Sequence, residues 1–121
     1  MKKTIMIVDD SQIIRSRIER NVKQVNLAVV AVASNGAEAL DLYKKHKPDM
    51  VTMDLTMPQM DGLACISAIC QFDAQAKILV ISALSDKATG IRAIKLGAQG
   101  FLYKPFTDDE LTEALEEILN D

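Results

Sequence analysis

Five short runs of apolar and β-branched residues recur along the chain, and longer stretches with helical periodicity separate them. The runs cover residues 4–8, 29–33, 50–53, 77–81 and 100–103. Runs that are apolar at nearly every position are typical of strands buried on both faces. Strands of this kind that alternate with helices form a parallel sheet between two layers of helices. The sequence therefore predicts a doubly wound α/β fold with five parallel strands and five helices.

The stretches between the runs carry apolar residues at helical spacing. These residues are Ile14, Ile18, Val22 and Val25; Leu40 and Tyr43; Leu63, Ile66 and Ile69; Ile91 and Ile94; and Leu111, Leu115, Ile118 and Leu119. Thr107 and Glu110 have the spacing of a capping box at the start of the last stretch. Asn35 with Glu38 suggests a second helix cap, and Gly97 predicts the end of a helix.

The composition fits one globular domain, because 49% of the 121 residues are hydrophobic and 26% are charged. We expect a single domain over residues 1–121 with no attached output domain. The net charge of −3 argues against direct binding of nucleic acid. The longest apolar run, LAVVAVA, is too short to span a membrane, so we expect a cytoplasmic protein without membrane contact. Cys65 and Cys70 lie five positions apart on one predicted helix, too poorly aligned to form a disulfide.

Polar side chains follow every predicted strand, and those after four of the five are candidates for a site; Ser34 and Asn35 after the second strand are interpreted as helix-capping residues only. Asp9 and Asp10 follow the first strand, Asp54 the third, Ser82 the fourth and Lys104 the fifth. In open parallel sheets the functional site lies beyond the carboxyl ends of the strands. We therefore expect three acids, a hydroxyl and an amine to meet on one rim of the sheet.

Three carboxylates on one rim need a compensating charge. At about 4 Å, each pair repels by roughly 1 kcal/mol in water and by roughly 4 kcal/mol at a partly buried site. Oxygen ligands without nearby histidine or cysteine favour Mg2+, which in turn favours a phosphoryl oxygen as a further ligand. Lys104 adds a positive charge and Ser82 a hydroxyl, which together suit a tetrahedral, oxygen-rich anion. Asp54 stands alone at its strand end and is the candidate nucleophile.

Each of these features also has a purely structural interpretation. Asp10 has the place of a helix cap, a role compatible with metal binding. A lysine before a proline is commonly a solvated side chain at a turn. The combination at the ends of several strands is what favours a functional site.

The combined motifs resemble the receiver domains of two-component response regulators, of the stand-alone, CheY-like kind. The resemblance rests on VDDS at 8–11, MDLTMPQMDG at 53–62, ISA at 81–83 and FLYKPF at 101–106. It implies a flavodoxin-like, CheY-like fold with the strand order 2-1-3-4-5. It also implies that Asp54 is the phosphoacceptor, and that Asp9, Asp10, Asp54 and the backbone carbonyl of Thr56 bind Mg2+.

The same resemblance assigns further roles at the rim. Lys104 would contact the phosphoryl group, Ser82 would be the switch hydroxyl and Phe101 the switch aromatic residue. Pro105 follows Lys104 in a peptide bond that this family often holds in the cis form. Two residues beyond the phosphoacceptor, Thr56 offers neither a carboxylate nor an amide; the same holds for Leu84 beyond the switch hydroxyl.

Pro58 and Gly62 would shape the loop after the phosphoacceptor, since the family has a turn in this place. The implied function is a signalling switch. It would accept a phosphoryl group from the phosphohistidine of a sensor histidine kinase or of a phosphotransfer protein. It would then bind a downstream protein through its fourth helix, fifth strand and fifth helix, in chemotaxis or in a phosphorelay. Beyond slow autophosphatase activity, we expect no enzymatic function.

Other phosphate-binding families fit the sequence less well. An aspartate-nucleophile phosphatase of the haloacid-dehalogenase type would need an acid two positions after Asp54, where Thr56 stands. A flavodoxin would need a hydroxyl- and glycine-rich loop after the first strand, where Asp9 and Asp10 would repel phosphate. No GxxxxGK motif of a P-loop occurs. A degenerate receiver that only binds partners remains a further alternative.

Overall fold

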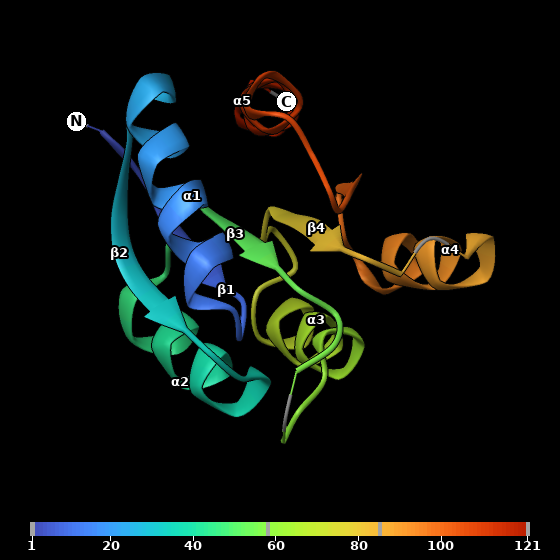
Figure 1. Ribbon diagram of the computed structural model, residues 1–121. Coiled ribbons are helices and arrows are strands. Elements are labelled where there is room, and N and C mark those ends of the chain that lie inside the picture. Colours follow the sequence, from blue (N-terminus) through green and yellow to red (C-terminus); the bar gives the residue numbers. More distant parts are fainter. Residues whose placement is uncertain (1, 58, 85, 121) are drawn as a thin grey trace.

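The computed structural model of the protein describes residues 2–57, 59–84 and 86–120. Strands and helices alternate along the chain, as predicted (Figure 1). The strands are β1 (Lys3–Val8), β2 (Leu27–Ala33), β3 (Met50–Met53), β4 (Ile78–Ser82) and β5 (Gly100–Tyr103). The helices are α1 (Gln12–Val22), α2 (Gly36–His46), α3 (Gly62–Phe72), α4 (Lys87–Leu96) and α5 (Asp108–Leu119), with a short 3-10 helix, η1 (Lys23–Val25), after α1.

The strands form one parallel sheet in the order β2-β1-β3-β4-β5, which confirms the order that the resemblance implied. The observed strands differ from the predicted runs by no more than two residues at either end. The order reverses between β1 and β3, because the chain moves outward to β2 before it returns to the centre. This reversal places the carboxyl ends of β1 and β3 side by side.

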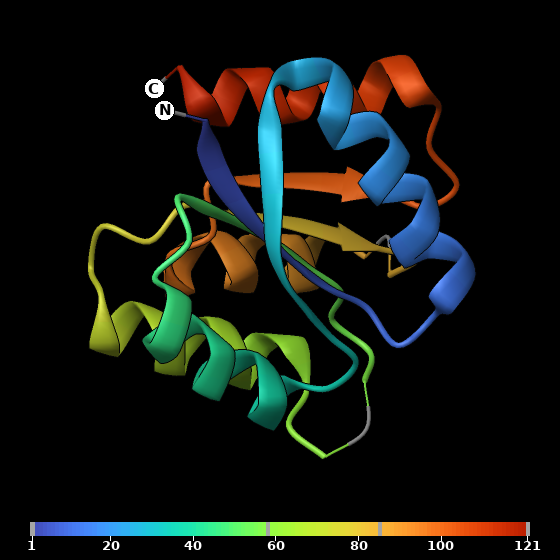
Figure 2. The same ribbon diagram turned by 90° about the vertical axis from the view of Figure 1, so that its left-hand side faces the viewer.

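Helices cover both faces of the sheet (Figure 2). On one face α1 and α5 enclose a core that includes Ile18, Leu111 and Leu115. On the other face α2, α3 and α4 enclose a second core, to which Tyr43 and Ile66 contribute. The three central strands are apolar at almost every position because both of their faces are buried.

Helix ends agree with the predicted caps. Thr107 and Glu110 form a capping box at α5, and the Asn35 side chain accepts a hydrogen bond from the Glu38 N–H at α2. Gly97 ends α4 with φ of +124°, a conformation that favours glycine. The stripe predicted through Val25 is interrupted, because α1 ends at Val22 and continues as η1.

The periodic residues of α4 do not all face the core. Ile91 and Ile94 are half exposed, whereas Ala93 between them is buried. The helix packs against α3 and lies beyond the outermost strand, β5 (Figure 1). The apolar pattern therefore identified the helix but not its buried face.

Both cysteines are free; the Cys65 side chain is buried and that of Cys70 is partly buried. None of the helices in the described part of the chain has the length and apolar character that a membrane crossing requires.

Candidate functional site

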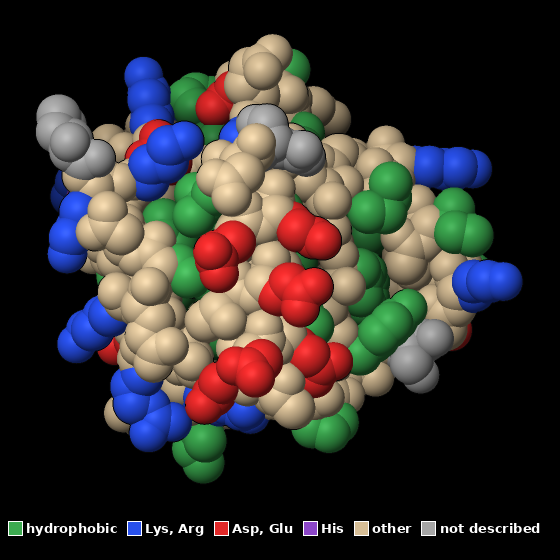
Figure 3. Space-filling view, turned by 90° about the horizontal axis from the view of Figure 1, so that it is seen from above, with side chains coloured by type: hydrophobic (Ala, Val, Ile, Leu, Met, Phe, Trp, Pro, Cys, Tyr) green, Lys and Arg blue, Asp and Glu red, His purple; other side chains and the backbone are tan. Residues whose placement is uncertain are grey.

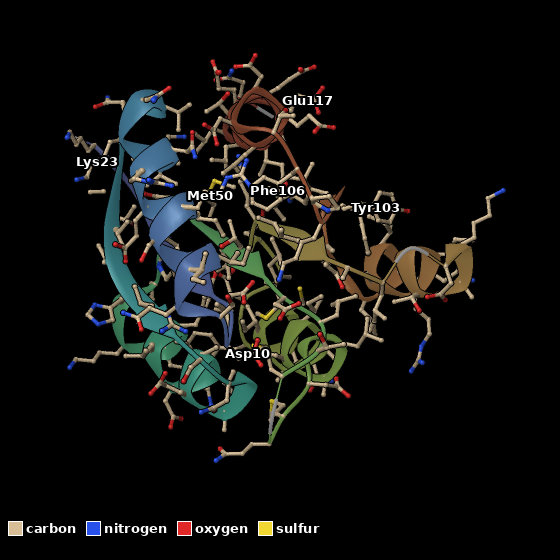
Figure 4. All side chains as sticks on the ribbon, viewed as in Figure 1. Asp10, Lys23, Met50, Tyr103, Phe106 and Glu117 are labelled. Atoms are coloured by element: carbon tan, nitrogen blue, oxygen red, sulfur yellow. The ribbon has the colours of Figure 1, made fainter. Side chains whose placement is uncertain are left out.

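The fold brings the two strand-terminal acids of β1 and β3 together. Val8 pairs with Met53 at the last position of the β1–β3 ladder, and the Asp54 N–H donates to the Val8 carbonyl oxygen over 2.9 Å. Asp10 lies in the middle of the loop that leads from β1 to α1 (Figure 4). One carboxylate oxygen from each of Asp9, Asp10 and Asp54 lies within 4.8 Å of the other two.

Asp9 is buried, and both of its carboxylate oxygens accept hydrogen bonds. Its Oδ1 accepts a hydrogen bond from the Ser11 N–H at 2.9 Å, and its Oδ2 accepts one from the Lys104 amine at 2.8 Å. Ser11, and not Asp10, is the N-cap of α1, because the Ser11 hydroxyl accepts a hydrogen bond from the Ile14 N–H. The cap considered for Asp10 is therefore wrong, and its carboxylate lies exposed at the rim.

Asp54 is only 3% exposed, and its Oδ1 has no hydrogen-bond partner within the described residues. The nearest cation is the Lys104 amine, whose Nζ lies 3.7 Å from this oxygen. Burial first and the charge of Asp9 second raise the pKa of Asp54 to about 6, and Lys104 opposes both effects. Lys104 is nearer to Asp9 than to Asp54, so it compensates the phosphoacceptor candidate incompletely.

Lys104 and Ser82 are joined through their main chains, because the Lys104 N–H donates to the Ser82 carbonyl oxygen over 2.9 Å. The Ser82 hydroxyl is buried and accepts a hydrogen bond from the Leu84 N–H at 3.1 Å. Phe101 is partly buried and packs against the core beneath α4; its ring centre lies 4.8 Å from that of Tyr103. Tyr103 itself is half exposed and projects over the α4 side of the sheet (Figure 4).

The loop after Asp54 carries the remaining residues that the resemblance singled out. Thr56 is exposed, and its backbone N–H lies near enough to the Asp54 carboxyl to lower the pKa of that group, against the larger effect of burial. A Cβ at Gly62 would lie 2.2 Å from the Asp54 carbonyl oxygen, so this position at the start of α3 requires glycine. Pro58 lies outside the described residues. The Lys104–Pro105 peptide bond is cis.

Sequence reasoning missed several residues that support the site. The Gly36 N–H donates to the Met60 carbonyl oxygen over 3.0 Å and so ties the start of α2 to the loop after Asp54. Arg15 donates to the Asp9 carbonyl oxygen, and Arg17 donates to the Phe106 carbonyl oxygen, both over 2.6 Å. No local pattern marks these residues, because each acts on a segment that is distant in the sequence or on a backbone atom.

The residues fit a hard divalent cation. Three carboxylates converge, one buried carboxylate oxygen lacks a hydrogen bond within the described chain, and all side-chain ligand atoms of the cluster are oxygens. Such a set suits Mg2+ better than softer metals. A bound cation would offset both the burial and the repulsion from Asp9 that raise the pKa of Asp54.

Comparison with known proteins identifies the family. Residues 5–116 match the model of the response regulator receiver domain. The chain is 45% identical to the chemotaxis protein CheY of Bacillus subtilis, over 99% of this chain and all of that protein. It is 42% identical to the chemotaxis protein CheY of Thermotoga maritima, over 98% of each chain.

Among solved structures, the chain is similar to one in the CheX-CheY-BeF3-Mg+2 complex from Borrelia burgdorferi. The TM-score is 0.94 at 31% identity, over 97% of this chain and 89% of that one. These matches support the CheY-like fold and give no support to the haloacid-dehalogenase alternative. The chain belongs to the family of response regulator receiver domains.

Proposed function

We propose that the protein is a phosphorylation switch whose phosphoacceptor is Asp54. The donor is the phosphohistidine of a sensor histidine kinase or of a phosphotransfer protein. The observation that carries the proposal is the buried Asp54 Oδ1, which has no hydrogen-bond partner within the described residues and lies 3.7 Å from the Lys104 amine. An unpaired buried carboxylate oxygen costs stability, and a reactive role accounts for its retention.

Asp9, Asp10, Asp54 and the backbone carbonyl of Thr56 are the proposed ligands of Mg2+. These residues would hold the ion, which when bound would supply positive charge to offset the carboxylates and the negative charge of the phosphoryl oxygens. Asp9 already accepts two hydrogen bonds, whereas Asp10 is exposed and has none from the described residues. Asp10 is therefore the ligand whose contribution can be tested with least disturbance to the fold.

In the transfer step, a carboxylate oxygen of Asp54 attacks phosphorus as the bond to the donor imidazole nitrogen breaks. An acyl phosphate forms, and the electron pair of the broken bond stays on the imidazole. Lys104 stabilises the phosphoryl oxygens, for which its amine shifts from Asp9 toward Asp54. Water later hydrolyses the acyl phosphate, and neither Thr56 nor Leu84 offers a carboxylate or an amide to assist this step.

Ser82 and Phe101 are proposed to transmit the change. The Ser82 hydroxyl now accepts a hydrogen bond from the Leu84 N–H, and it would turn to donate to a phosphoryl oxygen. Phe101 would move into the space that this turn vacates. A phosphoryl group adds about two negative charges, enough to bias such a two-state element.

The proposed output surface consists of α4, β5 and α5. A groove of about 470 Å³ between α4 and β5 is lined by Ile91, Ile94, Phe101 and Tyr103. It suits a protein partner with apolar anchor residues. Acidic side chains, among them Glu113, Glu116 and Glu117, gather over the neighbouring helix α5 (Figure 3), which disfavours nucleic acid on this side.

The relatives named as chemotaxis proteins favour a place in chemotaxis, with a phosphorelay as the alternative. The downstream target is then a protein that prefers the phosphorylated form. We place this exchange in the cytoplasm and away from any membrane. The solved complex of the Borrelia relative contains CheX, so a protein of that kind is one class of target to examine.

Labelling by a small acyl-phosphate donor tests the proposal directly. The wild-type protein should acquire one base-labile phosphoryl group when Mg2+ is present and none when it is chelated. Asp54→Asn should acquire none. Labelling of the asparagine variant to the wild-type level would refute the assignment of Asp54, and unlabelled wild-type protein would favour a degenerate receiver that only binds partners.

A second experiment tests the output. Captured target protein should be enriched on the phosphorylated wild type relative to Asp54→Ala. Equal binding to both forms would show that phosphorylation at this site does not control the surface.

A further inference from the structure

Lys104 is the first residue of the connection between β5 and α5. Its backbone is fixed, because the Lys104 N–H donates a hydrogen bond to the Ser82 carbonyl oxygen. The amine must shift from Asp9 toward Asp54 during the proposed reaction, while its main chain stays in place. The far end of the connection, at Phe106, therefore also needs an anchor.

Arg17 of α1 supplies that anchor through three contacts. Its Nη2 donates to the Phe106 carbonyl oxygen over 2.6 Å, and its Nε lies 3.2 Å from Asp108 Oδ1. Its guanidinium also lies over the Phe106 ring, 4.6 Å from the ring centre. Phe106 is 4% exposed and lies between α1 and α5 (Figure 4). Its side chain therefore packs into the hydrophobic core, while Arg17 holds its backbone.

Asn21, one helical turn after Arg17, completes the arrangement. It is 4% exposed, and its Nδ2 donates to the Arg17 carbonyl oxygen at 2.9 Å and to Asp108 Oδ1 at 3.1 Å. Asp108 thus receives hydrogen bonds from two α1 side chains, which lower the pKa of this carboxyl below its usual value. A buried amide directed at a neighbouring element fixes the relative position of the two segments.

The same helix also holds the other partner of the Lys104 ion pair. Arg15 donates to the Asp9 carbonyl oxygen over 2.6 Å. Asp9 and Lys104 are 95 positions apart in the sequence. Side chains of α1 nevertheless donate hydrogen bonds to the carbonyl oxygen of Asp9 and to that of Phe106, two residues after Lys104. The helix thereby sets the position of one segment against the other.

We propose that Arg17, supported by Asn21 and Asp108, is a positioning residue for Lys104. It fixes the β5–α5 connection so that the Lys104 amine stands within reach of Asp54. The proposal rests on the proposed phosphoryl transfer for its kinetic consequence, whereas the placement of Lys104 can be measured without any transfer. Arg17 touches neither Asp54 nor the proposed metal ligands and acts only through the connection.

The kinetic test compares Arg17→Met with Arg20→Met. Both remove one positive charge from α1 that acts on Asp108, but only Arg17 also forms hydrogen bonds to Phe106 and Asp108 within the described part of the chain. R20M therefore controls for the loss of charge alone. With a small acyl-phosphate donor and saturating Mg2+, R17M should be labelled about 10- to 100-fold more slowly, the cost of displacing a positioned group by up to ~1 Å. R20M should be labelled at the wild-type rate. Both are assayed well below their melting temperatures.

A double-mutant cycle with Lys104→Met separates positioning from a general structural role. If Arg17 acts through Lys104, R17M should slow labelling little or not at all in the K104M background. An equal reduction in both backgrounds would overturn the proposal, and so would wild-type labelling kinetics in R17M itself.

The NMR signal of the Lys104 ammonium group gives a readout that needs no phosphoryl transfer. In metal-free protein, R17M should shift this signal and broaden it, while R20M should leave it unchanged. An unshifted signal in R17M would refute the placement of Lys104 by Arg17 even if no form of the protein were labelled. Absence of labelling in wild-type protein would instead refute the proposed function.

Asp108→Ala provides a second variant in case R17M does not fold. It removes the acceptor shared by Arg17 and Asn21 but keeps the hydrogen bond to Phe106. It should slow labelling and shift the Lys104 signal in the same direction as R17M, to a smaller extent. Wild-type behaviour in both measurements would contradict the role of the cluster.

Discussion

Asp54 is the residue whose ordinary acidity the fold changes most clearly within the rim. Burial first and the Asp9 charge second raise its pKa from 3.8 to about 6, because the folded protein penalises the carboxylate form. Lys104 would reverse this shift if it paired with Asp54, but its shorter contact is with Asp9. A cation bound near Asp54 would therefore stabilise its charged, carboxylate form.

This shift predicts how stability depends on pH in metal-free protein. Between about pH 4 and 6 the folded state binds more protons at Asp54 than the unfolded state, so its contribution to stability falls as the pH rises. Asp54→Asn has no side chain that ionises at this position, so its stability does not fall in this pH range. It should be more stable than wild type at pH 7, by at most about 3 kcal/mol.

Denaturant unfolding in the presence of a chelator measures the difference. The two proteins should converge as the pH falls to about 3, below the ordinary pKa of 3.8, because Asp54 is then protonated in both the folded and the unfolded state. A wild-type protein that is the more stable of the two at pH 7 without metal would show that Lys104 compensates Asp54 fully.

At the scale of elements, the loop between β3 and α3 is held by glycines at its two contacts. Gly62 lies against the Asp54 carbonyl, and Gly36 at the start of α2 lies against the Met60 carbonyl. A Cβ at Gly36 would come within 2.2 Å of the Met60 oxygen, which is a backbone atom and cannot move independently. The position of this loop therefore depends on a neighbouring helix as well as on its own sequence.

Two glycine substitutions should have opposite effects on stability. Gly36→Ala forces the loop and α2 apart and should lower the free energy of unfolding by about 1–3 kcal/mol. Gly90→Ala, inside α4, would place its Cβ no nearer than 3.9 Å to Phe101 and Tyr103, its nearest neighbours outside the helix, and should raise stability by about 0.5–1 kcal/mol. Urea unfolding of both variants and of wild type measures the two changes in the free energy of unfolding. A G36A protein as stable as wild type would show that the loop shifts without cost.

At the scale of the whole molecule, three strands meet to build the site. Asp9 and Asp10 follow β1, Asp54 follows β3 and Lys104 follows β5. A ligand that binds this rim binds only the folded protein, since the unfolded chain does not hold these residues together. Ligand binding and global stability are therefore linked.

Mg2+ should consequently raise the free energy of unfolding, by about 2.7 kcal/mol when its concentration is a hundredfold above the dissociation constant. Chelation should reverse this gain. Asp10→Ala should weaken Mg2+ binding and lose most of the gain, yet change metal-free stability by no more than about 0.5 kcal/mol, because its side chain is exposed.

Thermal unfolding with and without Mg2+ measures this linkage. Asp41→Ala is the matched control, because Asp41 is an exposed aspartate of α2 outside the acidic cluster. It should retain the full gain. Equal stabilisation of D10A and wild type would exclude Asp10 as a ligand.

Local sequence patterns were sufficient to predict the alternating strands and helices of a parallel α/β fold, whereas the strand order came from the family resemblance. Apolar runs predicted every strand to within two residues at either end, and the cap at Thr107 and the glycine at 97 marked helix ends where they occur. These signals succeed because backbone conformation and hydrophobic periodicity depend on near neighbours. The convergence of the rim acids also followed, since parallel strands share one carboxyl edge.

The sequence by itself determined the alternation of strands and helices and the residue types at the strand ends. Only the tertiary structure decided that Ser11 caps α1, that Lys104 pairs more closely with Asp9 than with Asp54, and that Ile91 remains exposed. It alone also revealed that Arg17 donates a hydrogen bond to the Phe106 carbonyl oxygen in the connection between β5 and α5. These outcomes depend on distances between side chains and backbone atoms of segments far apart in the chain, and no local pattern of residues encodes such distances.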